Sequence, residues 1–255
     1  VGNIGIPYTS IADSTTDESV VVAEISSFQL ETAKTFHPFV SVILNITPDH
    51  LDRHKTLDNY AAIKESITKN QDKEDYCILN YDDERLRNFA KTLSCETVFF
   101  SSKEILDNGA YYNDGAIYYS KDGEATKVID VSDLNILGVH NYENAAAAIA
   151  ACFAFNVSFD LIRKGLKEFK AVAHRIEFVC ERQGVAFYND SKGTNTDAAI
   201  KAVCAMERPT VLIGGGYDKG AKFDDWVETF PGRVKHLVLI GATKEAIAKC
   251  ADEHG

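Results

Sequence analysis

The chain has 255 residues, of which 45% are hydrophobic and 25% charged, the balance of an ordinary globular protein. Its formal net charge of −11 argues against a nucleic-acid partner, and no apolar stretch approaches the roughly 20 residues needed for membrane insertion. No secretory signal is visible, and the six cysteines are scattered without a C-x-x-C pair, so we expect reduced thiols and a cytoplasmic location.

The first residues form a glycine-flanked turn around Asn3, which by itself indicates only that the backbone turns tightly. The sequence begins with Val1 rather than methionine, and it stops just after a helical pattern. We therefore expect a fragment of a longer protein.

Two apolar runs, residues 20–31 and 39–54, dominate the first part of the chain. Runs of this kind predict strands buried on both faces, as in a parallel sheet covered by helices. Ligands bind outside the carboxyl ends of such strands. The polar residues at those ends are Glu24, Ser26, Asp49, His50 and Asp52. Each could be an ordinary turn or cap residue, but two neighbouring runs that end alike favour a site.

Residues 56–70 have helical periodicity, with an apolar stripe through Tyr60 and with Asp58 or Asn59 available as the N-cap. Lys64 belongs to this stripe and should point inward. A lysine in such a position either snorkels at the edge of the buried face or serves as a functional amine whose pKa burial depresses.

From residue 76 the pattern predicts a strand, a helix and a strand, followed by short antiparallel strands joined by Asp-Gly turns. The expected elements are residues 76–80, 83–93, 97–101, 110–112, 116–119 and 125–129. Their tyrosines could stack on a base, but half-buried strand faces explain them more simply.

Residues 138–144 (GVHNYEN) open an alanine-rich helix over 145–155, and a second helix is expected over 159–169. Asn141 and Asn144 are three positions apart and therefore share one face of the first turn. Asn141 could cap the helix, or its amide could pair with an adenine edge. Spacing alone does not choose between the two.

We place a domain boundary at residues 170–171, giving domains 1–170 and 171–255. His174 and Arg175 precede a predicted strand pair, 177–181 and 185–188, which leads into residues 189–195 (NDSKGTN) and a helix over 194–206. A strand–turn–helix junction of this kind favours anions at the helix N-terminus.

A buried strand over 210–213 runs into residues 214–220, where three glycines form either a phosphate cradle or a plain tight turn. A last strand (234–240) and helix (243–251) should complete three parallel α/β units.

Several of these stretches together resemble the Mur ligase family. Residues 24–31 (EISSFQLE) followed by 45–53 (NITPDHLDR) look like its central domain, and GVHNYEN, the His174-Arg175 pair and NDSKGTN match further family stretches. The resemblance implies an α/β fold with a mostly parallel sheet flanked by helices plus a small antiparallel sheet. Part of a Rossmann-like C-terminal domain should follow.

The resemblance also implies an activity, namely ATP-dependent carboxylate–amine ligation through an acyl phosphate in peptidoglycan precursor synthesis. The Ser-Ser-Phe-Gln-Leu segment favours the branch that adds D-glutamate to UDP-N-acetylmuramoyl-L-alanine, acting as a monomer in the bacterial cytoplasm. A sibling Mur ligase and a folylpolyglutamate synthase-like ligase are alternatives. A non-catalytic nucleotide-binding module is an alternative of another class.

Site residues carried over from the family fall into four groups. Glu24, His50 and a carbamylated Lys64 would hold Mg²⁺ and carry catalysis, while Asn3, Ser26 and His50 would face the UDP-sugar. The residues expected to bind ATP are Asn141, Asn144, Arg175 and Asp190. Those expected on the D-glutamate side are Lys192, Thr194 and Lys219. The family's P-loop motif, G-x-x-x-x-G-K-[ST], does not occur in the sequence, so we expect this piece to be inactive alone.

Overall fold

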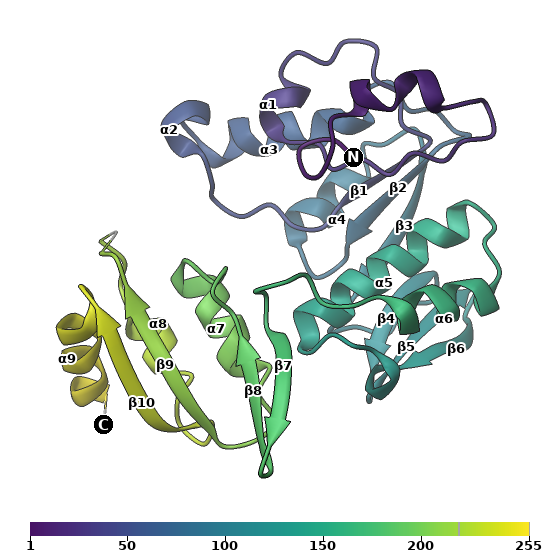
Figure 1. The fold of residues 1–255 in the computed structure, drawn as a ribbon. Helices are drawn as coiled ribbons and strands as arrows, with labels where there is room; N and C mark the ends of the chain where they lie inside the picture. Colours follow the sequence, from purple (N-terminus) through teal and green to yellow (C-terminus); the bar gives the residue numbers. More distant parts are fainter. Residues whose placement is uncertain (219, 255) are drawn as a thin grey trace.

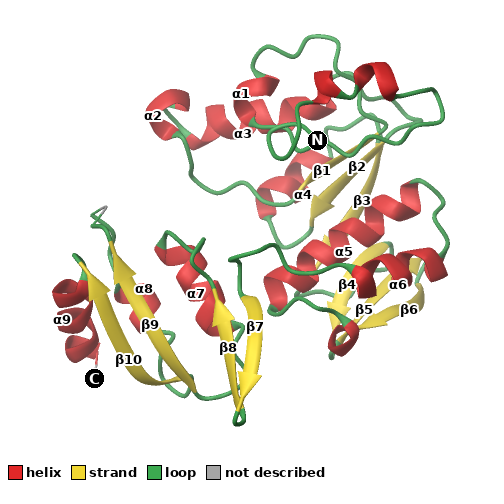
Figure 2. Cartoon of the chain, in the orientation of Figure 1, coloured by secondary structure: helices red, strands yellow, loops and turns green. Residues whose placement is uncertain are grey.

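A computed structural model describes residues 1–218 and 220–254, which form two groups of elements (Figure 1). The first group is built on a six-stranded sheet, and the second on two two-stranded sheets (Figure 2). No helix in the described ranges is both long and apolar enough to cross a bilayer. The predicted α/β class is confirmed.

The six strands follow one another across the large sheet in chain order. β1 to β4 are parallel neighbours, whereas β4, β5 and β6 pair antiparallel. The strands are β1 (Val40–Ile43), β2 (Tyr76–Asn80), β3 (Glu96–Ser101), β4 (Gly109–Asn113), β5 (Ala116–Lys121) and β6 (Glu124–Asp130). Both Asp-Gly pairs have positive φ, as two-residue hairpin turns require. The predicted antiparallel strands therefore extend the parallel sheet.

Helices cover both faces of this sheet because alternate strand residues point to opposite sides. Ile78 and Phe100 face a core that contains the buried side of α5, whereas Cys77 and Leu79 face a second core that contains Tyr60 of α3. The helices of this group are α1 (Ser27–Leu30), α2 (Leu51–His54), α3 (Leu57–Glu65), α4 (Glu84–Ala90), α5 (Val139–Ala154) and α6 (Phe159–Glu168).

Three sequence expectations for the first half are wrong in detail. Residues 20–23 do not form a buried strand: Val20 is 64% and Val22 81% exposed, and the pairing beside this stretch is an isolated bridge between Gly2 and Glu24. β1 does form, but it is an edge strand and Val42 is 37% exposed. An apolar, β-branched run becomes a buried strand only where neighbouring strands and helices cover it.

The third difference is the extent of the helix expected over 56–70. It is α-helical only from Leu57 to Glu65 and then tightens into a 3₁₀ turn over Ser66–Thr68. Thr56, not Asp58 or Asn59, is the N-cap, and its hydroxyl accepts the backbone N–H of Asn59 at 3.1 Å. A threonine hydroxyl three positions before a free N–H is a standard cap.

The second group packs three helices on its strands through a small core of Val203, Trp226 and Ile247. β7 and β8 are antiparallel, whereas β9 and β10 are parallel, so the expected three parallel units reduce to one parallel pair. The elements are β7 (Glu177–Arg182), β8 (Val185–Asn189), α7 (Thr196–Cys204), β9 (Thr210–Gly216), α8 (Asp224–Val227), β10 (Val234–Gly241) and α9 (Lys244–His254).

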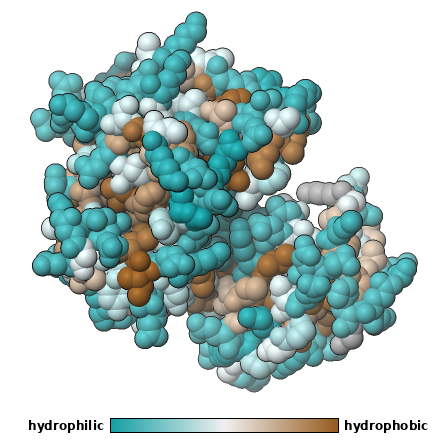
Figure 3. Space-filling view, turned by 180° about the vertical axis from the view of Figure 1, so that it is seen from behind, coloured by the Kyte–Doolittle hydropathy of each residue, from teal (hydrophilic) through white to brown (hydrophobic). Residues whose placement is uncertain are grey.

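Apolar side chains also reach the surface. Seen from behind, both groups show separate apolar patches in a largely polar surface (Figure 3). Ile213 of β9 is 67% exposed. The chain passes from the first group to the second between α6 and β7, and the boundary at residues 170–171 stays a prediction.

Candidate functional site

Asn3 and Glu24, two predicted site residues, lie side by side. The Asn3 Nδ2 atom donates to Glu24 Oε1 at 3.1 Å, and the Asn3 backbone N–H donates to the Glu24 carbonyl at 2.8 Å. Gly2 makes this approach possible, because its φ is +103° and a Cβ atom there would lie 2.3 Å from the Glu24 carbonyl oxygen. The backbone thus holds an amide and a carboxylate together at an exposed position.

His50 and Lys64 flank the buried ring of Tyr60. The His50 ring centroid is 6.5 Å from that of Tyr60, and the Lys64 Nζ atom lies 5.0 Å from the same centroid. His50 precedes α2 in a left-handed conformation with φ 50°, which turns the chain from the loop into the helix. Its side chain is exposed, whereas Lys64 is half-buried on α3. An imidazole and an amine therefore approach one aromatic ring.

Ser26 begins α1 as the N-cap of a capping box. Its Oγ atom accepts the Gln29 backbone N–H at 3.3 Å, and the Gln29 side chain accepts the Ser26 backbone N–H at 2.8 Å. The capping box therefore fixes the position of the Ser26 hydroxyl, two residues after Glu24.

His54 is a buried polar residue that sequence reasoning missed. Its Nε2 atom lies 3.1 Å from Ser27 Oγ and its Nδ1 atom 3.5 Å from Glu31 Oε1, while its ring stacks on Phe28. A hydrogen bond from Arg53 lowers the pKa of Glu31 and keeps it anionic. Because Ser27 and His54 are both buried, we interpret this network as a brace between α1 and α2 that positions His50.

The start of α5 carries a second set of polar groups. Asn141 is not the N-cap, which is Gly138; instead its Nδ2 atom donates to the Leu137 carbonyl at 2.7 Å. That contact leaves the Asn141 amide oxygen as an acceptor. Asn144, one turn further on, is exposed.

Glu143 on the same helix was also missed by the sequence prediction. Its Oε1 atom accepts from Asn80 Nδ2 at 2.6 Å, at the carboxyl end of β2. Burial raises the pKa of Glu143, and the hydrogen bond from Asn80 offsets part of this rise. Asn80 lies 63 positions earlier in the chain, so no local pattern could have found this pair.

Asp190 sits at the turn between β8 and α7, facing the start of α5. Its Oδ1 atom accepts the Ile176 backbone N–H at 3.0 Å. Burial raises the pKa of Asp190, and this hydrogen bond, followed by the charges of Arg175 and His140, opposes the rise. Burial, followed by the charge of Lys201, lowers the pKa of His140. The structure thus brings Asp190 and Arg175 near the helix that carries Asn141.

The turn after Asp190 also contains two of the three predicted D-glutamate residues, Lys192 and Thr194. Lys192 is exposed and donates its backbone N–H to the His174 carbonyl at 3.0 Å. Thr194 is exposed and precedes the helix, because α7 begins at Thr196 with Asn195 as its N-cap. The predicted helix start at residue 194 is therefore two residues early. Lys219 lies outside the described residues.

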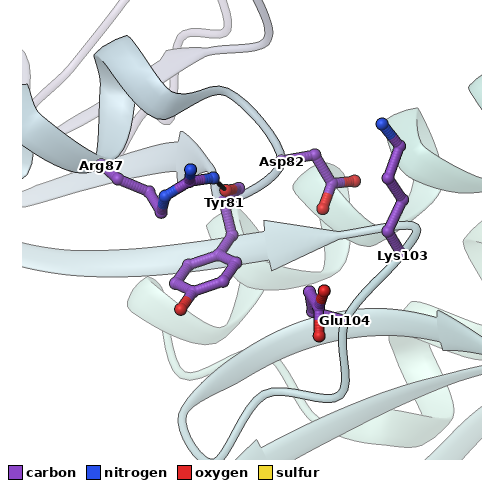
Figure 4. A pocket seen from close by; sticks show the side chains of 5 residues that line it. All are labelled: Tyr81, Asp82, Arg87, Lys103 and Glu104. Atoms are coloured by element: carbon purple, nitrogen blue, oxygen red, sulfur yellow. Dashed lines mark hydrogen bonds between the residues drawn. The ribbon is translucent and has the colours of Figure 1, made fainter.

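A polar cavity of about 410 Å³ lies at the carboxyl ends of β2 and β3. It is lined by Tyr81, Asp82, Arg87, Lys103 and Glu104 (Figure 4). Asp82 is held there because its Oδ1 atom accepts from Ser101 Oγ at 2.6 Å. None of the site residues predicted from the sequence lines this cavity. The polar residues that directly follow β2 and β3 were the sequence signal that could have predicted it.

The chemistry of the predicted metal ligands suits a divalent cation. A carboxylate such as Glu24 has lone pairs beyond the one that accepts from Asn3, and His50 exposes its imidazole beside Asp49, with Nε2 3.4 Å from Asp49 Oδ2. A separate group of three metal-competent residues, Asp224, Cys250 and His254, has ligand atoms within 4.8 Å of one another in the described part of the chain.

Comparison with known families identifies the class of protein. Residues 2–152, more than half of the chain, match the Mur ligase middle domain, and residues 174–255 match the Mur ligase glutamate ligase domain. The chain belongs to the Mur ligase family.

Curated relatives narrow the similarity further. The UDP-N-acetylmuramoylalanine–D-glutamate ligase of Lachnoclostridium phytofermentans is 51% identical over 255 residues, which cover 100% of this chain and 56% of the relative. The ligase of the same name from a Thermoanaerobacter species is 51% identical over 253 residues, covering 99% and 56%. The chain thus spans a little over half the length of these relatives.

Solved structures share the fold at low sequence identity. The ligase MurC from Thermotoga maritima superposes with a TM-score of 0.66 at 18% identity, covering 91% of this chain and 53% of that one. MurF from Acinetobacter baumannii gives 0.64 at 21% identity, covering 85% and 49%. These likenesses support the Mur ligase architecture alone.

Proposed function

We propose that this chain is part of an ATP-dependent ligase that joins D-glutamate to UDP-N-acetylmuramoyl-L-alanine in peptidoglycan synthesis, and so serves cell shape and division. The observation that carries this proposal is the 51% identity, along the whole chain, to curated D-glutamate ligases. We further propose a monomer in the bacterial cytoplasm and the division into domains 1–170 and 171–255.

In the proposed reaction, the carboxylate of the UDP-sugar substrate attacks the γ-phosphate of ATP to form an acyl phosphate and ADP. The amine of D-glutamate then attacks the acyl carbon, and phosphate leaves through a tetrahedral intermediate. Both steps bring anions together, so positive charge and hydrogen-bond donors at the meeting point accelerate them.

Residues of the first group would act on the UDP-sugar. Asn3 and Ser26 would orient it by hydrogen bonds, and the exposed His50 would face its reacting end. Glu24, His50 and Lys64 would hold Mg²⁺, with Lys64 carbamylated by carbon dioxide. When bound, the cation neutralises phosphate charge. The closeness of Asn3 to Glu24, and of His50 and Lys64 to Tyr60, supports these roles.

Residues near the start of α5 would bind the nucleotide. The free amide oxygen of Asn141 can accept from the adenine amino group, with Asn144 beside it, while Arg175 would reach the phosphates and Asp190 the ribose hydroxyls. The charge interaction between Asp190 and Arg175 supports this arrangement. Lys192, Thr194 and Lys219 would contact D-glutamate.

The test is phosphate release by the protein in its native length, given ATP, UDP-N-acetylmuramoyl-L-alanine and one amino acid at a time. We expect release with D-glutamate and little with meso-diaminopimelate or L-lysine. Release with another amino acid, or with folate, would point to a sibling ligase or a folylpolyglutamate synthase-like enzyme. ATP binding without substrate-dependent release would indicate a non-catalytic module. For the 255 residues expressed alone we expect no turnover, since they carry no P-loop motif.

A further inference from the structure

Helices α8 and α9 each direct two metal-competent side chains toward a common point, and none of these four residues belongs to the proposed ligase site. Asp224 begins α8 and Glu228 is its C-cap, four positions later. Cys250 and His254 have the same spacing on α9. Side chains four positions apart on a helix share one face. Ligand atoms of Asp224, Cys250 and His254 all lie within 4.8 Å of one another.

Packing of the two helices fixes this arrangement. Trp226 of α8 and Ile247 of α9 belong to the same buried core, where their relative exposures are 5% and 1%. Trp226 lies between Asp224 and Glu228, and Ile247 lies about one turn before Cys250. The four polar side chains are therefore displayed by a rigid pair of helices.

The histidine ring is already oriented as a metal-bound imidazole would be. His254 Nδ1 lies 2.9 Å from the Cys250 carbonyl oxygen. Since a carbonyl oxygen only accepts, Nδ1 carries the proton. Metal-binding histidines commonly donate their second nitrogen to a carbonyl in this way, which fixes the ring and its tautomer.

The other ring nitrogen faces two carboxylates at a distance that no hydrogen bond spans. His254 Nε2 lies 4.0 Å from Asp224 Oδ1 and 3.9 Å from Glu228 Oε1, whereas hydrogen bonds end near 3.2 Å. Zinc–nitrogen and zinc–oxygen bonds are each about 2.0–2.2 Å long, so a tetrahedral ion holds two such atoms roughly 3.3–3.5 Å apart. The side chains therefore need to close by only about half an ångström to share an ion.

We propose that Asp224, Glu228, Cys250 and His254 form a binding site for a borderline-soft divalent cation such as Zn²⁺. The bound cation would link α8 to α9. Thiolate and imidazole ligands select zinc over magnesium. Cys250 Sγ lies 3.9 Å from His254 Nδ1 and within 4.8 Å of an Asp224 carboxylate oxygen. Zinc binding to a cysteine replaces the thiol proton, so affinity should increase with pH.

The experiment uses the protein in its native length, stripped with a chelator and titrated with Co²⁺ and then Zn²⁺ in millimolar Mg²⁺. We expect one equivalent of Co²⁺ to give tetrahedral visible bands and a sulfur-to-cobalt charge-transfer band, both displaced by Zn²⁺. Cys250→Ser should remove the charge-transfer band. His254→Gln should weaken zinc binding by at least about hundredfold, the upper range found for losing even an indirect metal contact.

Cys204→Ser is the matched control, because Cys204 is an exposed cysteine on the neighbouring α7. This variant should keep the bands and the zinc affinity, and circular dichroism should show that all variants fold. Unchanged zinc affinity in the Cys250→Ser/His254→Gln double variant would overturn the proposal. So would the absence of a sulfur-to-cobalt charge-transfer band in the unsubstituted protein.

Discussion

The amine of Lys64 lies over the ring of Tyr60, with Nζ 5.0 Å from the ring centroid. A ring face stabilises the cationic form of an amine, whereas carbamylation consumes the neutral form. In the proposed ligase Lys64 therefore changes from a cation held by Tyr60 to an anion beside Mg²⁺. The contact with Tyr60 then positions the side chain only before carbon dioxide has reacted.

Replacing Lys64 tests its proposed role directly. Lys64→Ala should lower the ligase rate of the native-length protein on the order of 10²–10³-fold, a loss typical of one electrostatic group at a reacting centre. Short carboxylates added to the assay should restore part of the rate by replacing the carbamate. Lys69→Ala, an exposed lysine just beyond the same helix, is the control. Undiminished activity of Lys64→Ala would mean that Lys64 only snorkels.

The approach of Gly2 to Glu24 gives a second prediction with a matched control. Gly2 and Gly5 both have positive φ, but an added Cβ atom at Gly2 meets the Glu24 carbonyl at 2.3 Å and at Gly5 meets nothing within 4 Å. Both alanine variants should carry a backbone cost of about 1 kcal/mol. Gly2→Ala should cost about 1–3 kcal/mol more through overpacking, and it should reduce ligase activity by displacing Asn3 and Glu24.

Urea unfolding and the ligase rate, measured on both glycine variants, check this prediction. Equal losses at the two positions would show that the approach of Gly2 to Glu24 does not matter for the site.

Asp190 should govern ATP binding. Asp190→Asn keeps an oxygen for the Ile176 N–H but removes the negative charge, so hydrogen bonds to ribose weaken. The KM for ATP should increase about tenfold or more, given the roughly 1.5–3 kcal/mol of a hydrogen bond to a charged group. Asp197→Asn, an exposed residue paired with Lys201 on α7, should leave the KM unchanged. An unaltered KM in Asp190→Asn would remove this residue from the nucleotide site.

Glu143 predicts a pH dependence of stability. Burial raises its pKa in the folded protein, so its contribution is favourable below the pKa of the unfolded chain and is lost as the pH rises through the folded value. Glu143→Gln keeps the acceptor for Asn80 without the charge. It should be more stable than the parent at pH 7.5, on the order of 0.5–1 kcal/mol for a half-buried group, and gain little at pH 4.

Denaturant unfolding at the two pH values measures this difference, with Glu124→Gln on the exposed part of β6 as the control. A stabilisation that is the same at both pH values would contradict the proposed charge effect.

Local sequence patterns correctly predicted the turns and elements that depend on interactions between neighbouring residues. The Asp-Gly turns and the succession of elements from residue 76 follow from neighbouring residues, and the structure contains them. The alanine-rich helix predicted over 145–155 is also present, but α5 begins earlier, at Val139. The prediction of a buried strand at 20–23 was wrong. Apolar β-branched residues favour a buried strand, but burial also requires distant segments to pack over it. His54 and Glu143 were missed for a similar reason, since their partners Ser27 and Asn80 are 27 and 63 positions away.

The family motifs, unlike the secondary-structure patterns, selected residues that are distant in the sequence. Family motifs selected Asn3 for the UDP-sugar, Glu24 for the metal, and Asp190 and Arg175 for ATP. In the structure Asn3 lies beside Glu24, and the charge of Arg175 acts on Asp190. Their chemical roles stay predictions. The cavity beside Asp82 lies at strand ends that were predicted correctly, but no motif marked it.

The two Asp-Gly turns also bear on the order in which the chain folds. They join β4, β5 and β6 through connections of only a few residues, whereas β1 and β2 must close a long loop that contains α2 and α3. Short loops close faster and at lower entropic cost. We therefore expect the three-stranded meander to nucleate the large sheet, with β1 added late in the kinetic sequence.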